Sequence, residues 1–394
     1  MTYKELFANN PIVKKLAAIQ LVAYFGAWFS NVAIYTLLVN LGASPIIISI
    51  VVAMHFIPGI LLSPISGTIV DKIEAKKLML ILMSVELSMT LCFLLVNSLD
   101  EIWLLLIFIF IRMSAASMFF TTEMALMPKL LSGDVLSKVN EIHSIIWSFT
   151  FTAGMAIGGI VVNLFGIKIA FIVDALFFVS AILLVLSTNF NYEHKKVTTK
   201  IIDSIKEGFA YLKENKHLWH FIFLHGAVGL TAFDSLVTLL ADFHYKYMIA
   251  VPLAIGLTNA IRSLALMIGP FIITNWITKK RIFYVFLFQG ITIIIWGTIQ
   301  DSFYLGLFGS FLTGLVTTTL WSHTYADLQE RVDKEYLGRV LAYNEMFFML
   351  SMAITTMFIG IMANFVPLSV VTVILGLCFI GVGFYYKKVL TWKI

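Results

Sequence analysis

The segment Gly67-Thr-Ile-Val-Asp71-Lys72-Ile-Glu-Ala-Lys76-Lys77 places five charged residues within seven positions. The stretches on either side of it, 46–70 and 77–97, are almost entirely apolar. Each is long enough to cross a bilayer, which takes about 20 mostly apolar residues. Gly67 permits close approach of two helices, and the lysines suit the anionic inner leaflet of a membrane. The segment therefore predicts a short charged loop between two transmembrane helices.

The same pattern of apolar runs and short connections extends over the whole chain. Of its 394 residues 60% are hydrophobic and only 12% are charged, whereas a soluble domain has roughly 45–50% apolar and about 25% charged residues. This composition excludes a water-soluble enzyme, a nucleic-acid-binding protein and a disordered chain. Twelve runs are expected to span a membrane: 13–39, 46–70, 77–97, 102–126, 137–164, 168–189, 217–242, 252–276, 281–300, 302–326, 337–364 and 367–388.

The basic residues lie mainly on one side of these runs. Among the 27 Lys and Arg, Arg112 and Arg262 lie within runs, and Lys168 and Lys246 lie at loops on one membrane face. The other 23 share the opposite face with both termini. Because cytoplasmic loops carry an excess of Lys and Arg, both termini are predicted to be cytoplasmic. The net charge of +5 then reflects topology and indicates no nucleic-acid partner.

One long polar segment divides the chain into six runs and six. Residues 190–216 contain six lysines, and within them Ile201, Ile205, Phe209 and Leu212 share one face of an amphipathic helix, as in helices that lie at a membrane surface. Short motifs recur across it: LSKV at 136–139 and LGRV at 337–340, TLL at 36–38 and 238–240, and a Lys pair at 76–77 and 279–280. Their offsets of 201, 202 and 203 residues indicate a duplicated six-helix unit, a transporter architecture. The expected units are residues 1–189, a cytoplasmic linker at 190–216, and residues 217–394.

The loop at 67–77 resembles the signature loop of the major facilitator superfamily, Gly-x-x-x-Asp-Arg/Lys-x-Gly-Arg/Lys-Lys/Arg. Gly67, Asp71, Lys72 and Lys77 match it, while Glu74 or Ala75 replaces the second glycine. The resemblance implies an all-α membrane protein of twelve transmembrane helices, arranged as two six-helix bundles around a central cavity. It also implies that Asp71 contacts the positive N-terminal end of the eleventh helix, with Arg339 joining a clasp between the halves.

Further segments are similar to the drug:proton antiporter branch, which includes macrolide-efflux and enterobactin-exporter proteins. These are LLSPISGTIVDK, MPKLLSGDVLSKVNEIHS and LGRVLAYNE. Residues 154–159, Gly-Met-Ala-Ile-Gly-Gly, resemble the antiporter motif Gly-Pro-x-x-Gly-Gly with Met155 in place of proline. Gly154, Gly158 and Gly159 permit tight helix packing. The first helix departs from the branch, since Phe25-Gly26-Ala27 replaces a common Phe-Gly-Asp.

Ionisable side chains at membrane depth are functional candidates because a charge at the bilayer centre costs about 2.5–3.5 kcal/mol. The candidates for proton coupling are Asp234, Glu345, Glu86, Asp174 and His55. Those for contact with substrate in the cavity are Arg112, Arg262, Phe25, Trp28, Asn31 and Tyr35. Each group has a structural alternative: Glu86 pairs with Arg112, and the aromatic stripe of the first helix is ordinary packing.

These features favour a monomeric secondary transporter of the bacterial inner membrane that exports amphiphilic drug-like or siderophore-like molecules in exchange for protons. The alternatives are a lysophospholipid transporter or flippase and a non-transporting receptor. A membrane enzyme lacks support because no nucleophile motif, metal triad or phosphate loop is found. No cofactor or metal is expected. The partners are the bilayer, protons and the substrate.

Overall fold

The computed structural model describes residues 3–192, 201–273 and 276–391, without the side chains of residues 67, 68, 71, 134, 137, 201–204 and 391. The described chain is helical. Its elements are α1 (Tyr3–Asn9), α2 (Pro11–Asn40), α3 (Pro45–Ala53), α4 (Ile57–Lys72), α5 (Ala75–Cys92), η1 (Phe93–Leu95), η2 (Leu99–Glu101), α6 (Ile102–Leu130), α7 (Gly133–Phe165), α8 (Ile167–Leu186), α9 (Ile201–Glu214), α10 (Leu218–Gly226), η3 (Ala227–Thr231), α11 (Asp234–Phe243), η4 (Tyr245–Tyr247), α12 (Val251–Ile273), α13 (Ile282–Ile299), α14 (Phe303–Gln329), α15 (Leu337–Met362) and α16 (Leu368–Thr391).

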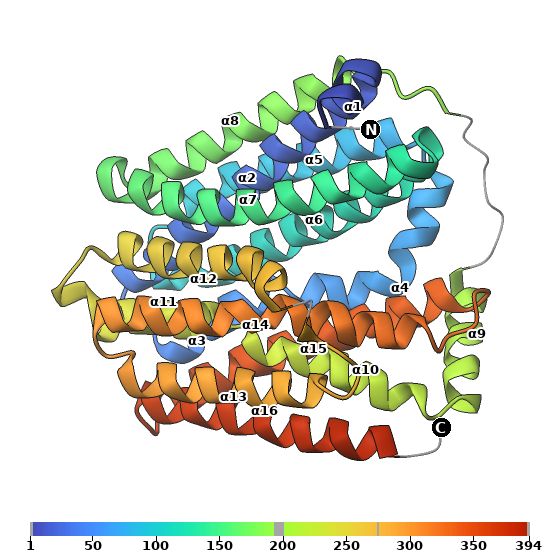
Figure 1. Ribbon diagram of the computed structural model, residues 1–394. Coiled ribbons are helices and arrows are strands. Elements are labelled where there is room, and N and C mark those ends of the chain that lie inside the picture. The colour runs from blue at the N-terminus through green and yellow to red at the C-terminus, as the bar shows by residue number, and fades with distance from the viewer. Residues whose placement is uncertain (1–2, 193–200, 274–275, 392–394) are drawn as a thin grey trace.

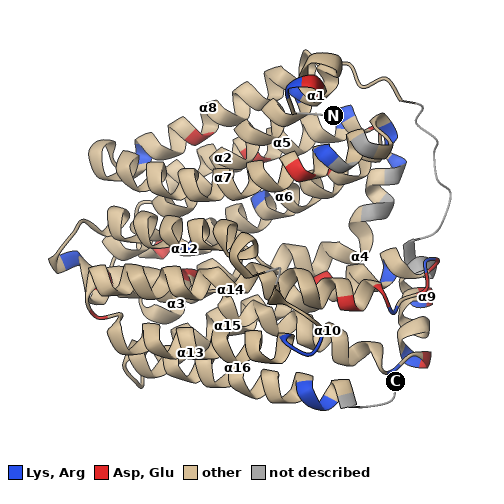
Figure 2. Cartoon of the chain, in the orientation of Figure 1, with Lys and Arg blue, Asp and Glu red and all other residues tan. Residues whose placement is uncertain are grey.

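Twelve segments of the described chain are long and apolar enough to cross a membrane. They coincide with the twelve apolar runs, so the predicted fold class is confirmed. Both chain termini and α9 lie on one side of the molecule, which we call the terminal face; the opposite side is the far face (Figure 1). Most Lys and Arg residues gather toward the terminal face (Figure 2).

We call the helices α1–α8 the N-half and the helices α10–α16 the C-half. Within the N-half, α2 packs on α7 and α8, and α5 packs on α6. Within the C-half, α13 packs on α16, and α12 packs on α14. The halves meet where α7 packs on α12 and where α3 and α4 pack on α15. Figure 1 shows α3 among the helices of the C-half.

Glycines bring backbones together where α7 meets its neighbours. A Cβ atom at Gly158 would lie 2.7 Å from the carbonyl oxygen of Phe29 on α2. One at Gly159 would lie 2.6 Å from the carbonyl oxygen of Pro252 on α12, and one at Gly256 would lie 2.6 Å from that of Met155. These contacts lie in the far-face part of α7 and α12, and the halves are therefore packed backbone to backbone there.

Substituting Gly159 by leucine is expected to separate the halves at the far face, because the colliding atoms belong to backbone and cannot rotate away. Spin labels at Lys168 and Lys246, both exposed on that face, measure the separation in a background lacking Cys92 and Cys378. The distance distribution should shift to longer values. Gly381→Leu is the matched control, since a Cβ there meets no atom within 4 Å. An unchanged distribution in Gly159→Leu contradicts the prediction.

The run at 46–70 was expected to be one helix, and this is wrong. It forms α3 and α4, with a turn at residues 54–56 between them. Pro58 lies in the first turn of α4, and its ring nitrogen has no proton to continue the α3 hydrogen-bond ladder. The break places His55 in the turn, where its Nδ1 lies 3.1 Å from the carbonyl oxygen of Val51.

The run at 217–242 is also broken, into α10, η3 and α11. Gly229 occupies η3, and a Cβ there would lie 2.9 Å from the Phe348 carbonyl oxygen and 3.0 Å from the Met352 nitrogen of α15. Glycine is a weak helix former, and here it permits close approach of α15. At the break the Thr231 carbonyl oxygen accepts a hydrogen bond from the Phe233 N–H (2.9 Å) in place of a helical one.

The linker helix α9 docks on the start of α15. Tyr343 donates a hydrogen bond to the Ile205 carbonyl oxygen (3.0 Å), and Arg339 pairs with Glu207 (3.0 Å). Leu212 is buried while Phe209 is 52% exposed. The expected amphipathic helix is present, with its apolar side chains divided between the protein and its surroundings.

Candidate functional site

A buried ion pair lies inside the N-half. Arg112 on α6 and Asp174 on α8 approach within 2.8 Å, and both side chains are almost fully buried. Arg112 also donates a hydrogen bond to Ser30 Oγ on α2 (2.6 Å), and its guanidinium lies over the rings of Phe93 and Phe178. Arg112 was expected to face substrate; here it connects three helices of one half.

Glu86 does not pair with Arg112, the structural alternative raised by the sequence. It is buried on α5 at 4% exposure and interacts electrostatically with both Arg112 and Asp174. On α2, a Cβ at Gly26 would collide with the Asp174 carboxylate. The glycine of Phe25-Gly26-Ala27 thus makes room for an acid from another helix.

The second mid-helix arginine, Arg262, forms a hydrogen bond with the backbone at the break between α10 and α11. Arg262 on α12 donates a hydrogen bond to the Thr231 carbonyl oxygen (2.6 Å) and lies over the Phe233 ring. Only 7% of it is exposed, which differs from the expected cavity position. Its charge acts on Asp234.

Asp234 lies where the two halves meet. It is the first residue of α11, where a negative charge is favoured by the helix dipole, and it is half-buried. It interacts electrostatically with Arg262 of the C-half and Tyr35 of the N-half. The Tyr35 ring packs against His55 at 5.9 Å. The surroundings of Asp234 therefore depend on how the halves are arranged.

The side chains of the stripe on α2, from Phe25 to Tyr35, pack against more than one helix. Phe25 packs on Phe177 of α8, whereas Trp28 packs on Trp147 and Phe151 of α7. Tyr35 is buried and Asn31 is half-buried. Most of the stripe is occupied in packing within the N-half.

Glu345 on α15 differs from Asp174, because no described residue forms an ion pair with it. It is half-buried and forms no ion pair or hydrogen bond with any residue that the structure describes. Its charge acts on Tyr325, whose ring stacks on Trp321 at 5.0 Å. Both rings pack against His225, which is fully buried. An unpaired carboxylate beside aromatic rings suits a cation or an amphiphilic molecule with a polar group.

Sequence reasoning missed a fifth carboxylate inside the bundle, Glu123 on α6. Its side chain is fully buried and accepts a hydrogen bond from Tyr24 of α2 (2.5 Å). The Tyr24 ring packs edge-on against His143 of α7 at 5.8 Å. The repeat offset was a usable signal, because His225 and Thr324 lie 201 positions after Tyr24 and Glu123.

The proposed clasp is only partly described. The side chains of Gly67 and Asp71 lie outside the described residues, and Lys72 and Lys77 are exposed. Arg339 pairs with Glu207 of α9, a partner that the sequence did not suggest.

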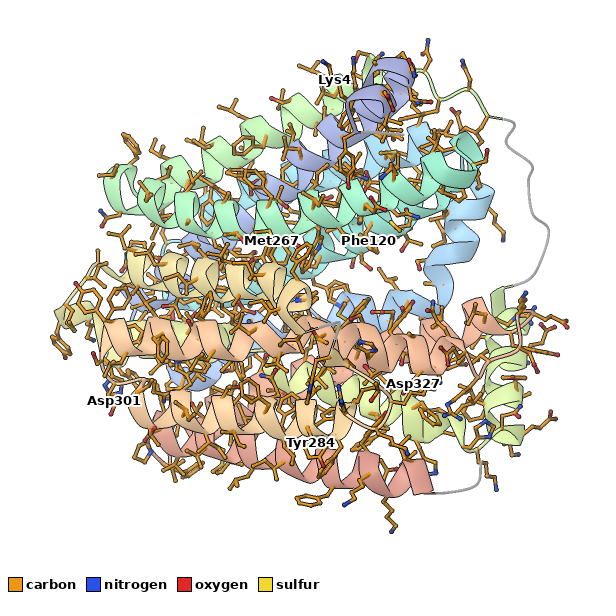
Figure 3. The ribbon with its side chains drawn as sticks, in the orientation of Figure 1. Lys4, Phe120, Met267, Tyr284, Asp301 and Asp327 are labelled. Carbon is orange, nitrogen blue, oxygen red and sulfur yellow. The ribbon has the colours of Figure 1, made fainter. Side chains whose placement is uncertain are left out.

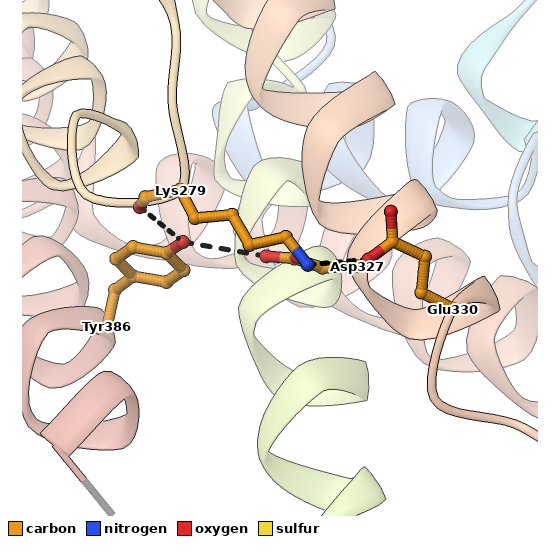
Figure 4. A network of polar contacts seen from close by, with 4 residues as sticks. All are labelled: Lys279, Asp327, Glu330 and Tyr386. Carbon is orange, nitrogen blue, oxygen red and sulfur yellow. Dashed lines mark hydrogen bonds and ion pairs between the residues drawn. The ribbon is translucent and has the colours of Figure 1, made fainter.

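The lysine pair that repeats the loop of the N-half takes part in a network in the C-half. Lys279 forms ion pairs with Asp327 (3.6 Å) and Glu330, and Tyr386 donates a hydrogen bond to the Lys279 carbonyl oxygen (2.9 Å) (Figure 4). Glu330 raises the pKa of the Lys279 ammonium by hydrogen bonding, and Lys279 lowers the pKa of Glu330 in the same way. The network ties the terminal-face ends of α14 and α16 to the loop before α13.

Replacing Lys279 by methionine is expected to destabilise the protein by about 1 kcal/mol, because Asp327 is 5% exposed and loses a cationic partner. Since Lys279 holds a raised pKa and Glu330 a lowered one, their stabilisation is present near neutral pH. It is lost as pH falls through the Glu330 pKa or rises through the Lys279 pKa. Thermal unfolding across pH measures both effects. Lys280→Met, at an exposed neighbour, should resemble the wild type, and equal behaviour of the two variants contradicts the prediction.

No group of three His, Cys, Asp or Glu among the described residues is arranged to hold a metal ion. Cys92 and Cys378, both described, are free thiols.

In the described part of the chain, twelve helices long and apolar enough to span a membrane, with ionisable side chains buried among them, are typical of an integral membrane transporter. The Major Facilitator Superfamily model matches residues 16–356. The chain belongs to this superfamily.

Its relatives of known sequence are distant. An uncharacterized MFS-type transporter of Bacillus subtilis, YfiS, is 28% identical over 216 residues, covering 53% of this chain and 51% of the relative. The chain spans about half the length of this relative and of a second one from Bacillus subtilis, YkuC. Macrolide efflux protein A of Enterococcus faecalis is 24% identical over 76% of this chain and 96% of its own.

Solved transporters share the fold. The nucleoside transporter NupG superposes with a TM-score of 0.77 at 13% identity, covering 97% of this chain and 99% of that one. An auto-inhibited POT family peptide transporter gives a TM-score of 0.77 at 8% identity, with 98% of both chains covered. At these identities the likeness concerns the fold alone.

Proposed function

We propose that this transporter exports amphiphilic small molecules in exchange for protons, by alternating access. The observation that carries the proposal is Glu345, a half-buried carboxylate at membrane depth that is paired with no described residue. Beside it, the stacked rings of Trp321 and Tyr325 offer an apolar surface for substrate. Such contacts, mostly aromatic with few polar groups, are typical of small-molecule sites. The likeness to macrolide efflux protein A supports export.

The coupling requires a group whose environment changes when the halves move. Asp234 meets this requirement because its electrostatic partners come from both halves. In our proposal, residues 1–189 and 217–394 move as two bundles, and residues 190–216 link them. The terminal face is cytoplasmic in the bacterial inner membrane, since basic residues gather there (Figure 2). The protein acts as a monomer.

The test is uptake into everted membrane vesicles that carry an imposed pH gradient. Erythromycin, ethidium and a lysophosphatidylcholine are the probes, and vesicles from cells with an empty vector are the control. Uptake of erythromycin or ethidium should depend on the gradient and stop when nigericin collapses it. Movement of the lysolipid alone would assign the protein to lipid transport instead. Uptake equal to the control for every probe contradicts the proposal.

A further inference from the structure

Side chains from three helices of the N-half form a buried polar cluster around Glu123. The Tyr24 hydroxyl of α2 donates to Glu123 Oε2. The His143 ring of α7 packs on both Tyr24 and Phe120, at 5.8 and 5.7 Å. Glu123 is 0% exposed and His143 is 7% exposed. The cluster lies within α2, α6 and α7, away from Asp234 and Glu345.

Several atoms of this cluster have no hydrogen-bond partner among the described residues. They are Glu123 Oε1, His143 Nδ1 and Gln20 Nε2. No described Lys or Arg pairs with Glu123, whereas Asp174 in the same half has Arg112. Burying an ionised carboxylate without a cation is costly. In this arrangement of the halves Glu123 is therefore more stable as the neutral acid.

The matching positions of the C-half carry no carboxylate. His225, Thr324 and Asn344 each lie 201 positions after Tyr24, Glu123 and His143. His225 Nδ1 and Thr324 Oγ1 lie within hydrogen-bonding distance, 2.9 Å apart, as do Tyr24 and Glu123 of the N-half. Trp321, which lies 201 positions after Phe120, likewise packs on the histidine of its cluster. Packing at this position is thus achieved with neutral polar groups, and it does not require an acid.

We propose that Glu123 is a proton-binding residue of the transport cycle. It holds its proton at Oε1 while the halves are arranged as described. It gives that proton to water when the halves move and the contact between Phe120 and His143 opens, and the Tyr24 hydrogen bond then stabilises the carboxylate. Phe120 is 42% exposed and lies at the boundary between the halves (Figure 3). The role in transport rests on the proposed proton coupling; the binding of a proton does not.

The side chains around Glu123 determine whether its neutral or its ionised form is favoured. From α2 these are Tyr24 and Gln20, and His143 of α7 lies behind Tyr24, against its ring. Glu86 of α5 acts on Tyr24, so a second carboxylate lies near the cluster. Arg112 acts on Glu86, whereas no described Lys or Arg acts on Glu123 itself, which favours retention of the proton on Glu123.

Proton binding is measured by infrared spectra of the full-length protein in lipid nanodiscs over a pH titration. A protonated carboxyl band present in the wild type should be missing in Glu123→Gln. Thr324→Val removes the matching hydrogen bond in the C-half, and it should keep the band. Tyr24→Phe removes a hydrogen bond that favours the carboxylate, and it should move the midpoint of the band upward by about one pH unit. A band unchanged in Glu123→Gln overturns the proposal.

The transport role is measured in proteoliposomes with erythromycin as the probe. Glu123→Gln should lose uptake driven by a pH gradient and keep exchange of labelled for unlabelled erythromycin, while Glu123→Asp should restore part of the driven uptake. Full driven uptake in Glu123→Gln, with a gradient-dependent wild type, overturns the role. If the band is lost in Glu123→Gln but the wild type ignores the gradient, proton binding by Glu123 is supported and the proposed coupling fails.

Discussion

Replacing Arg112 by methionine is expected to destabilise the protein by about 3–5 kcal/mol, because Asp174 is left as an uncompensated charge. The Asp174 side chain is 0% exposed, and its Oδ2 rests on the Arg112 guanidinium. Its Oδ1 has no hydrogen-bond partner among the described residues. The thermal unfolding midpoint and the yield of monodisperse protein in detergent measure the loss.

The double variant Arg112→Met/Asp174→Asn is the matched control for this prediction. It removes both charges, so much of the lost stability should return. A single variant as stable as the wild type would show that the ion pair contributes little. A double variant less stable than the single one would show that the two side chains act independently.

Asp234→Asn and Glu345→Gln are expected to reduce pH-driven uptake of erythromycin to the level of empty liposomes. Each variant keeps the shape of the side chain and removes its titrating group. Asp234 meets the charge of Arg262 from the C-half and acts on the Tyr35 hydroxyl of the N-half, and Glu345 has no described partner to fix its protonation. Initial rates in proteoliposomes, with the amount of inserted protein quantified, give the measurement.

Glu335→Gln serves as the comparison for these two variants, because Glu335 is exposed beyond the end of α14. It should transport at the wild-type rate. Full activity in both Asp234→Asn and Glu345→Gln would remove these carboxylates from the coupling mechanism.

The helices were predictable because a span is a local property of the sequence. Each apolar run contains enough residues to cross a bilayer, and every run became a span. The breaks were missed because they depend on tertiary contacts. The α-helix gives way to η3 at Gly229, where the backbone of α15 lies close. The Thr231 carbonyl oxygen then accepts a hydrogen bond from Arg262 of another helix.

Site residues were harder to predict because the sequence shows that a charged residue lies within a span but does not show which residue it pairs with. Arg112 was visible in the sequence, but the choice of Asp174 over Glu86 depends on how α6, α8 and α2 are packed. Glu123 was missed because it stands near the end of a run, where an acid is unremarkable. Only the fold places Tyr24 and His143 beside it.

The position of α3 has a consequence for how the protein is made. Although α3 is encoded early, it packs on α15 and α11 of the other half. During synthesis it enters the membrane long before α15 exists, and until then its contact surface must face lipid or another chain. A fragment ending before the C-half therefore lacks the partner of one of its own helices. The boundary of the six-helix unit expected from the sequence and the boundary of the packing of α3 therefore do not coincide.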